Sequence, residues 1–343
     1  MSKIKEALSK IKASKQCSSA NKEEHIVLID AMNMFCRSFT TINSLNQKGQ
    51  HVGGLLGFLK SLNLTVKTLN PTKLYIVFEG DNSSDRRKRI FPKYKSSRKG
   101  VQNNTVFYDV NESMESFNHQ LCRLIEYLHN LPVYLYSVDN FEADDIIGYL
   151  AQKSCLKSKV SIVSNDKDYL QLVNENLFVY NPLEKLSYNK ELIFEKFQIY
   201  PHNFVTARQV TGDTSDEIPN VKSFQFKTLV KYFPMISSNE KIVLKDLIEY
   251  AKEKINCKKP SPKYVDFLNS IRQCEINKSL MDLSLIEDLL LDDEKQLIES
   301  VVNKDVKLNY SNIVQMMLLD GIDSIDPYMN ADVLKTNFYK LNS

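Results

Sequence analysis

Three acidic residues lie close together where a helix is expected to begin. Glu142, Asp144 and Asp145 stand in the stretch FEADDIIGYLAQK, soon after the apolar run LPVYLYSV. That run is typical of a buried strand, and apolar residues recur at helical spacing after the acids, so the acids should fall on the first helical turn. Acids also favour helix N-termini through the helix dipole alone, so this position by itself does not establish chemistry.

Acidic residues also end or follow three other apolar runs. HIVLID ends in Asp30, KLYIVFEG contains Glu79, and Asp166 and Asp168 come just past the strand expected in VSIVSNDKD. If these runs are strands of one parallel sheet, their carboxyl ends share the edge where such sheets bind ligands. Like charges gathered there would raise one another's pKa values, and divalent cations would relieve that repulsion. Oxygen ligands without His or Cys favour Mg²⁺ or Mn²⁺, and a set this large suits two ions about 4 Å apart, as in phosphodiester cleavage.

Other classes of function fit the sequence less well. The chain has no GxxxxGK[ST] motif, and Gly53, Gly54 and Gly57 do not form GxGxxG, which argues against a nucleotide cofactor. The six cysteines are scattered without a CxxC pair, which argues against zinc and disulfides and favours a reducing cytoplasm. No apolar run approaches the roughly 20 residues of a membrane helix, and the N-terminus lacks the apolar core of a secretory signal.

The alternation of expected strands and helices predicts an α/β fold with a mostly parallel central sheet flanked by helices. With 343 residues, 43% of them hydrophobic, the chain is long enough for one large domain or two modest ones. We expect a basic N-terminal arm at 1–22, an α/β core at 23–190 and a helical C-terminal region at 191–343. The expected strands are 25–30, 73–80, 131–138 and 160–168, and the expected helices of the core are 53–67, 114–131 and 141–153.

The net charge of +3 is unevenly distributed. Residues 86–99, RRKRIFPKYKSSRK, hold eight basic residues and no acid. Such a run is often a solvated loop or a nuclear-import-like patch. Phe91, Pro92 and Tyr94 are interleaved with the cations, which favours a surface that grips phosphates and stacks on bases. The arm at 1–22 adds six lysines against one glutamate and leaves the rest of the chain near neutral.

Five motifs follow one another between about residues 25 and 235. They are LIDAMNMFCRSF, VFEG, FPKYKSSR, FEADD followed by SNDKDYLQLV, and TGDTSDEIPNV. Together they resemble the structure-specific 5′-nucleases: flap endonucleases and 5′-3′ exonucleases of bacteriophage type, related to the 5′-nuclease domain of bacterial DNA polymerase I and to phage ribonuclease H. The resemblance implies a PIN-like core, a helical arch at about 81–115 and a duplex-binding, helix-three-turn-helix-like motif at about 202–233.

The resemblance also implies roles for the acids. Matched by motif position, they divide into the ligand shells of two Mg²⁺ or Mn²⁺ ions, some of them acting through water. The first shell would be Asp30, Glu79, Glu142 and Asp144 with Asp145 in support, and the second would be Asp166, Asp168, Asp213 and Asp216. The family usually has Asp where this chain has Glu79, so Asp81 is a rival ligand.

The basic residues receive roles in the same way. Tyr94 would stack on the unpaired terminal nucleotide, and Lys95 would offset charge that develops on the scissile phosphate. Arg37 would hold a phosphate near the metals, although a surface ion pair is the alternative for this residue. Further contacts to nucleic acid are expected from Arg86, Arg87, Lys93, Arg98, Lys222, Lys227 and Lys231.

The duplex-binding motif departs from the family pattern. Asn220, Ser223 and Gln225 stand where the family carries glycines in a GVxGxGxKT loop, whose backbone approaches a duplex phosphate and a bound monovalent cation. Glycine adopts the required positive φ without strain, whereas Ser and Gln do not. We therefore expect lysine side chains, rather than a K⁺ site, to bind the duplex here.

The implied function is a Mg²⁺-dependent 5′-nuclease that cuts 5′ ends or flaps of DNA and RNA:DNA primers in replication. The implied partners are branched or nicked DNA and RNA:DNA hybrids, with a replication clamp or a single-strand-binding protein as further candidates, and the protein is expected to be a monomer. Two alternatives stay open: a PIN-type ribonuclease, which the arch motif disfavours, and a catalytically silent DNA-structure-binding protein, which the full set of acids disfavours.

Overall fold

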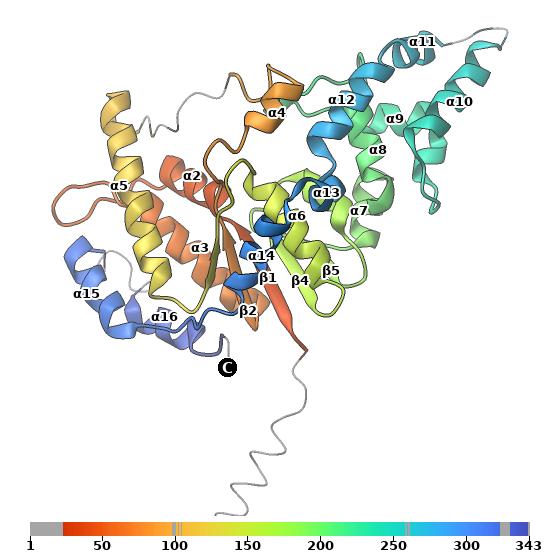
Figure 1. Ribbon diagram of the computed structural model, residues 1–343. Coiled ribbons are helices and arrows are strands. Elements are labelled where there is room, and N and C mark those ends of the chain that lie inside the picture. Colours follow the sequence, from red (N-terminus) through yellow and green to blue (C-terminus); the bar gives the residue numbers. More distant parts are fainter. Residues whose placement is uncertain are drawn as a thin grey trace, which may run out of the picture.

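A six-stranded sheet forms the centre of the protein, in the order β3-β2-β1-β4-β5-β6 (Figure 1). The computed structural model describes residues 23–97, 101, 103, 105–257, 259, 261–322 and 330–341, so the expected arm at 1–22 lies outside the described residues. Strands β1 to β5 run parallel, and β6 is antiparallel to β5. The strands are β1 (His25–Asp30), β2 (Lys73–Val77), β3 (Tyr134–Tyr136), β4 (Lys159–Val163), β5 (Leu177–Asn181) and β6 (Leu186–Tyr188).

This sheet confirms the predicted α/β class, and all four expected strands are present. Each of β2, β3 and β4 is shorter than its apolar run, and β5 and β6 were not expected. The central strand β1 is buried on both faces, because Val27 and Ile29 belong to one hydrophobic cluster while Ile26 and Leu28 belong to another. A continuous apolar run without polar alternation is typical of such a strand.

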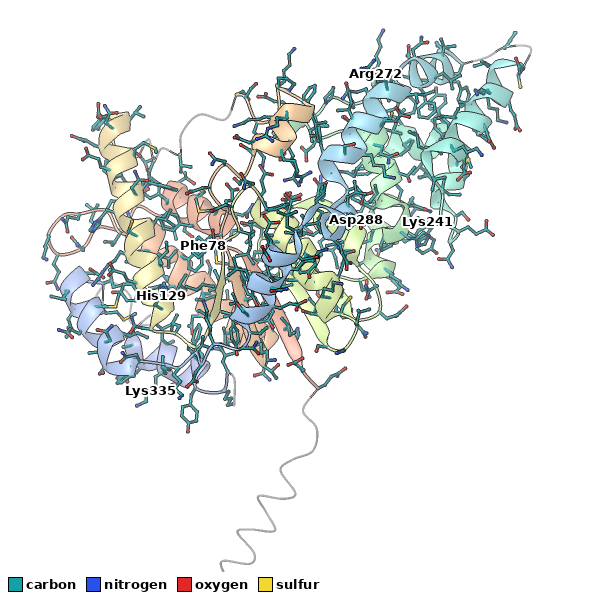
Figure 2. The ribbon with its side chains drawn as sticks, in the orientation of Figure 1. Phe78, His129, Lys241, Arg272, Asp288 and Lys335 are labelled. Atoms are coloured by element: carbon teal, nitrogen blue, oxygen red, sulfur yellow. The ribbon has the colours of Figure 1, made fainter. Side chains whose placement is uncertain are left out.

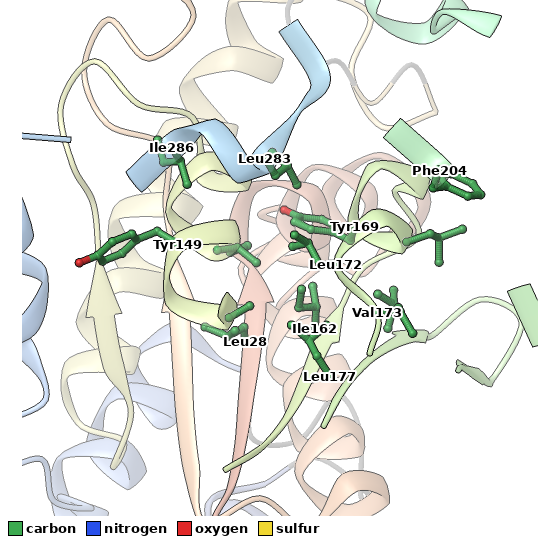
Figure 3. Packing of buried hydrophobic residues seen from close by; sticks show 14 of the residues in the cluster. Leu28, Tyr149, Ile162, Tyr169, Leu172, Val173, Leu177, Phe204, Leu283 and Ile286 are labelled. Atoms are coloured by element: carbon green, nitrogen blue, oxygen red, sulfur yellow. The ribbon is translucent and has the colours of Figure 1, made fainter. Parts of the chain in front are cut away.

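Helices cover both faces of the sheet. Side chains of α2 (Ala31–Thr41), α3 (Gly53–Leu69) and α5 (Val110–His129) share a cluster with Val27 and Ile29. On the other face lies α6 (Ala143–Ser154), together with the 3₁₀ helix η1 (Lys167–Leu172). Figure 3 shows Tyr169 and Leu172 of η1 packed beside Leu28 and Ile162 of the sheet and near Leu283.

A helical region stands beside the sheet, and α4 (Asp85–Ile90) links it to the core (Figure 1). Within this region α8 packs against α12, and α4 also contacts α12. Figure 2 places Lys241 and Arg272 at this end of the molecule, opposite His129 and Lys335. Its elements are α7 (Lys190–Phe197), α8 (Pro201–Thr211), η2 (Thr214–Asp216), α9 (Phe226–Tyr232), η3 (Pro234–Ser237), α10 (Leu244–Ile255), α11 (Pro262–Asn269) and α12 (Ile271–Met281).

The last helices return to the α/β core instead of extending the helical region expected at 191–343. α15 (Tyr310–Asp320) and α16 (Ala331–Phe338) contribute to the cluster of α2, α3 and α5. The preceding elements, η4 (Leu283–Leu285), α13 (Ile286–Leu289) and α14 (Asp292–Val301), contact α6 or β3. None of the described helices is both long and apolar enough to cross a membrane.

Candidate active site

The predicted acids fall at the carboxyl ends of four neighbouring strands. Asp30 ends β1, Glu79 lies two residues past β2, Glu142 precedes α6 after β3, and Asp166 precedes η1 after β4. In the strand order, β2 and β4 lie on opposite sides of β1, so β1 and β4 flank the point where the order reverses. Ligands of open parallel sheets bind at such a point.

Helix capping explains why these carboxylates lie at this edge. The side chain of Asp30 accepts the backbone N–H of Asn33 at 2.9 Å and begins α2. Asp166 accepts the N–H of Asp168 at 2.8 Å and begins η1, and Glu142 and Asp145 form a capping box at α6. A capping side chain directs its carboxylate toward the strand end. The same acids can therefore stabilise helix N-termini and form part of an acidic site.

Arg87 is an internal partner of three of these acids. Its side chain is only 2% exposed, and its guanidinium donates to Glu142 at 2.5 Å, to Asp144 at 3.1 Å and to Asp145 at 2.9 Å. Its Nε donates to the carbonyl of Leu280 at 2.8 Å, which attaches α4 to the end of α12. Arg87 was expected to contact nucleic acid. The structure instead buries it as the counter-ion of the acidic cluster.

The other residues of the basic run divide between the site and the surface. Arg86 donates to both oxygens of Asp145, at 2.9 and 3.0 Å, whereas Lys93 is exposed and Arg98 lies outside the described residues. Tyr94 is 2% exposed, and its hydroxyl donates to Glu142 at 2.8 Å, so its ring is not available for the expected stacking on a base. The amine of Lys95 lies 3.0 Å from Glu142 and therefore reaches into the acidic site.

A second arginine joins the acids on the other side of the site. The Nε of Arg208 donates to Asp168 at 2.7 Å, and its Nη2 donates to Asp213. Asp216 lies 3.9 Å from the amine of Lys95, between the two groups. A pocket of about 610 Å³ opens here and is lined by polar and charged residues of the core and of the α8–α9 segment. Its lining includes Asn33, Asp166, Lys167, Arg208, Asp213, Asp216 and Gln225.

The acids are crowded enough to change their protonation. Burial raises the pKa of Asp30 to about 7, and the charges of Glu79 and Asp144 add to this effect. Burial, with the charges of Asp168 and Asp144, raises the pKa of Asp166 to about 8. Burial also acts on Asp144, but the charges of Arg87 and Lys95 outweigh it and lower the pKa of that carboxyl. The site therefore favours further positive charge beside Asp30 and Asp166.

The donor chemistry fits a hard divalent cation, because the cluster consists of carboxylates without His or Cys. Within the part of the chain that the structure describes, however, no three such residues are already arranged around a metal position. Arg87, Lys95 and Arg208 occupy carboxylate oxygens that an ion would use. Metal binding thus requires carboxylates to turn away from these internal cations.

Glu79 and Asp81 differ in their relation to the cluster. Both are exposed, but the charge of Glu79 is felt by Asp30, whereas the backbone N–H of Asp81 donates to Asp139 at 3.1 Å. This arrangement favours Glu79 as the acid that serves the site. Arg37 lies two turns along α2 from Asp30, and its buried Nη1 has no hydrogen-bond partner among the described residues.

The expected duplex-binding residues lie on one short segment. Lys222 is exposed in the loop before α9, and Lys227 and Lys231 are exposed on α9 itself. In that loop Ser223 adopts a φ of 62°, the left-handed conformation that glycine would adopt freely, whereas Gln225 has a φ of −124°. The loop thus has a glycine-like turn at one of the three altered positions.

Tyr169 is a residue of the site that sequence reasoning missed. Its side chain is 1% exposed, and its hydroxyl has no hydrogen-bond partner among the described residues. Burial raises the pKa of this phenol, and the charges of Asp30, Asp144 and Asp166 add to the effect. An aromatic residue after Asp168 carries no signal in the sequence that separates it from an ordinary core residue.

Comparison with known proteins agrees with this geometry. Residues 25–198 match the family model for the 5′-3′ exonuclease N-terminal, resolvase-like domain. A 5′-3′ exonuclease of Buchnera aphidicola is 33% identical over 223 residues, which are 63% of this chain and 73% of that protein. A 5′-3′ exonuclease of Aquifex aeolicus is 27% identical over 302 residues, which are 88% and 96% of the two chains.

Solved structures show the same fold. A structure of the bacteriophage T5 protein crystallised with metal ions covers 82% of this chain and 99% of its own, at 14% identity and a TM-score of 0.63. The bacteriophage T5 flap endonuclease in a pseudo-enzyme-product complex with DNA and metal ions has a TM-score of 0.64, at 15% identity. It covers 82% of this chain and 98% of its own.

The mostly parallel sheet, with carboxylates at its switch point beside a basic helical segment, has the PIN-like fold of the T5 structures. Together with the family match over residues 25–198, this architecture shows that the chain belongs to the 5′-3′ exonuclease family.

Proposed function

We propose that the protein is a Mg²⁺-dependent 5′-nuclease that hydrolyses phosphodiester bonds at 5′ ends or flaps of DNA and RNA:DNA primers. The observation that carries the proposal is the meeting of carboxylates from four strand ends with the amine of Lys95 at a single sheet edge. The names of the sequence relatives support the 5′-3′ polarity, and the T5 complex with DNA and metal ions supports the substrate and the cofactor.

We assign the acids to two cation positions, as the motif resemblance groups them. Bound divalent cations would supply Lewis acidity and a more acidic attacking water. The first group is Asp30, Glu79, Glu142 and Asp144, with Asp145 in support, and the second is Asp166, Asp168, Asp213 and Asp216.

The protein's own cations would position the scissile phosphate. Lys95 now pairs with Glu142, and its amine would turn toward a phosphate once Glu142 has another positive partner. Arg37 has a buried Nη1 that finds no hydrogen-bond partner in the described part of the chain, which suits an anion at that position. Tyr94 holds Glu142 in place through its hydroxyl and excludes water from one side of the site.

The surface around the site suits a nucleic-acid strand. The pocket of about 610 Å³ lies between the acids and the start of α9, so a strand could pass from one to the other. Lys222, Lys227 and Lys231 would contact duplex phosphates beyond it, with Arg86, Lys93 and Arg98 toward the arch. We propose branched or nicked DNA and RNA:DNA hybrids as substrates of a cytoplasmic monomer, with a replication clamp or a single-strand-binding protein as candidate partners.

Incubation with a duplex that carries a labelled 5′ flap tests this function. We expect short labelled products in Mg²⁺, no cleavage in EDTA, and no cleavage of a matched 3′ flap. Binding of the flap without EDTA-sensitive cleavage would instead support the silent DNA-binding protein. Cleavage of single-stranded RNA with no preference for a flap would support the PIN-type ribonuclease.

A further inference from the structure

Glu217 lies directly after η2 (Thr214–Asp216), in a turn that we call the η2 loop. Its side chain attaches the end of the basic run to this loop. The carboxylate of Glu217 accepts hydrogen bonds from the backbone N–H of Ser96 at 3.0 Å, from the hydroxyl of Ser96 at 2.5 Å and from the backbone N–H of Ser97 at 2.7 Å. Beside them the N–H of Lys95 donates to the carbonyl of Asp216 at 3.1 Å. These contacts join segments about 120 residues apart in the sequence.

The three donors on Ser96 and Ser97 form a cradle for an anion. They follow Lys95, whose φ of 53° is in the left-handed region, and successive N–H groups at such a turn converge on one point. Glu217 itself has a φ of 61°. Positive φ is uncommon for residues other than glycine, so two facing residues hold sterically unfavourable conformations around this one contact.

The cradle lies where a nucleic-acid strand would enter the site. Ser96 and Ser97 are exposed, and Lys95, directly before them, places its amine 3.0 Å from Glu142 in the acidic cluster. A phosphate carries the same charge and the same acceptor oxygens as the carboxylate that now fills the cradle.

We propose that the Ser96–Ser97 cradle binds a phosphate of the single-stranded 5′ strand, and that Glu217 fills it as an internal competitor in the free protein. The proposal rests on the proposed function, because that function supplies the phosphodiester ligand. When the strand binds, its phosphate takes the three donors, the Glu217 carboxylate moves into solvent, and residues 94–97 separate from the η2 loop.

If Glu217 instead supports binding of the strand, its removal should change the affinity in the opposite direction. If its carboxylate only holds the basic run in a binding-competent position, its removal would weaken binding of the 5′ strand. If it competes with phosphate, its removal would strengthen that binding. Affinity therefore separates the two roles directly.

The experiment measures the affinity of Glu217→Ala and Glu217→Gln for a fluorescent duplex with a 5′ single-stranded overhang, in EDTA so that no cleavage occurs. We expect Glu217→Ala to bind the overhang on the order of two- to fivefold more tightly, with a smaller gain for Glu217→Gln and no gain for a blunt duplex. Asp85→Asn removes a carboxylate from α4 without touching the cradle and controls for a general charge effect.

A second substitution tests the cradle itself. In the Glu217→Ala background, Ser96→Ala removes one donor and should reverse part of the gain for the overhang. Unchanged or weaker binding by Glu217→Ala, with an unchanged thermal midpoint, overturns the proposal, as does an equal gain for Asp85→Asn. If the unmutated protein cleaves 5′ flaps while Glu217→Ala gains nothing, only this inference fails. If the unmutated protein neither binds the overhang nor cleaves flaps, the proposed function fails together with this inference.

Discussion

Internal arginines hold the acidic residues together in the free protein. Arg87 meets three carboxylates and Arg208 meets two, and both guanidinium groups are almost fully buried. Removing one partner from such a buried network typically lowers the free energy of unfolding by about 3–5 kcal/mol, because the remaining charge is left without compensation. These arginines therefore allow a concentration of negative charge that the fold could not otherwise hold before a cation arrives.

Asp144→Asn and Asp166→Asn should each lower the rate of flap cleavage by on the order of 10²–10³ or more, because each removes a charge on which transition-state stabilisation depends. Affinity for the flap should change little, since phosphate contacts come from other residues. Single-turnover cleavage and fluorescence anisotropy would measure the two effects. Asp293→Asn, an exposed acid on α14, is the matched control, and near-normal cleavage by either site variant would remove these acids from the mechanism.

Stability should fall as the pH rises in the absence of divalent cations. The pKa values of Asp30 and Asp166 are about 7 and about 8 in the folded protein, against an ordinary value of 3.8. From about pH 3.8 to about pH 8, the folded state therefore binds more protons than the unfolded state. The stability that this difference contributes is fully present below about 3.8 and is lost as the pH rises through about 8.

Thermal unfolding in EDTA would show this effect as a midpoint that falls by several degrees between pH 5 and pH 9. Mg²⁺ should reduce the fall, because a bound cation replaces the protons. A midpoint that stayed constant or rose over this range would mean that the two carboxyls are not held protonated in the folded protein.

The sequence could indicate the acids but not their partners. The acids of residues 30–168 follow apolar runs, so their place at the carboxyl edge follows from the parallel sheet alone. Arg87 reaches Glu142 across 55 residues, and Arg208 reaches Asp168 across 40, and no local pattern links either pair. Arg87 stands in a run of cations whose other members are mostly exposed, which is why it was assigned to nucleic acid.

Among the elements, the segment from α4 to Ser97 combines a buried part and an exposed part. Lys95→Ala should lower the single-turnover rate on the order of tenfold or more with little loss of affinity, because the amine acts beside the reacting phosphate. Lys88→Ala removes an exposed cation of α4 and should weaken binding and reduce its salt dependence instead. Should Lys95→Ala change affinity alone, Lys95 would be a binding residue only.

The α8–α9 segment should bind duplex DNA through lysines rather than through a bound K⁺ ion. Replacing K⁺ by Na⁺ at constant ionic strength should leave the affinity for a flap duplex unchanged, and Lys227→Ala should weaken it several-fold. Ser223, however, already has the positive φ of a glycine. A clear preference for K⁺ in the binding assay would therefore show that this backbone turn is sufficient for a cation site.

The elements that could be predicted are those with a distinct apolar pattern, and length alone did not decide this, since the three-residue strand β3 was expected and the five-residue strand β5 was not. Helical periodicity predicts the long amphipathic helix α5, and apolar runs predict the buried strands β1 and β4. The strand β6 has only three residues, two of them exposed at the sheet edge, so LSY gave no signal. Strand β5, LFVYN, is an apolar and aromatic run typical of a buried strand, and its sequence does carry that signal.

At the scale of the whole molecule, the last helix completes the core that the first helices begin. Leu334 of α16 is fully buried in the cluster shared with α3. Leu334→Ala should lower the free energy of unfolding by about 2–5 kcal/mol through lost contacts and a cavity, without changing cleavage at low temperature. Leu319→Ala, at a side chain that is 61% exposed, should change it by less than about 0.5 kcal/mol. Equal effects in urea titrations of the two variants would contradict this packing.

The return of α16 to the first-formed layer also sets the order in which the protein is completed during synthesis. The ribosome delivers β1, α2 and α3 first, yet the apolar surface that α16 covers on them stays open until residues 331–338 have left the exit tunnel. Leu280, whose carbonyl accepts a hydrogen bond from Arg87 and orients it, is likewise synthesised late. A nascent chain therefore carries every carboxylate of the site before Leu280 and residues 331–338 are available to complete the packing around it.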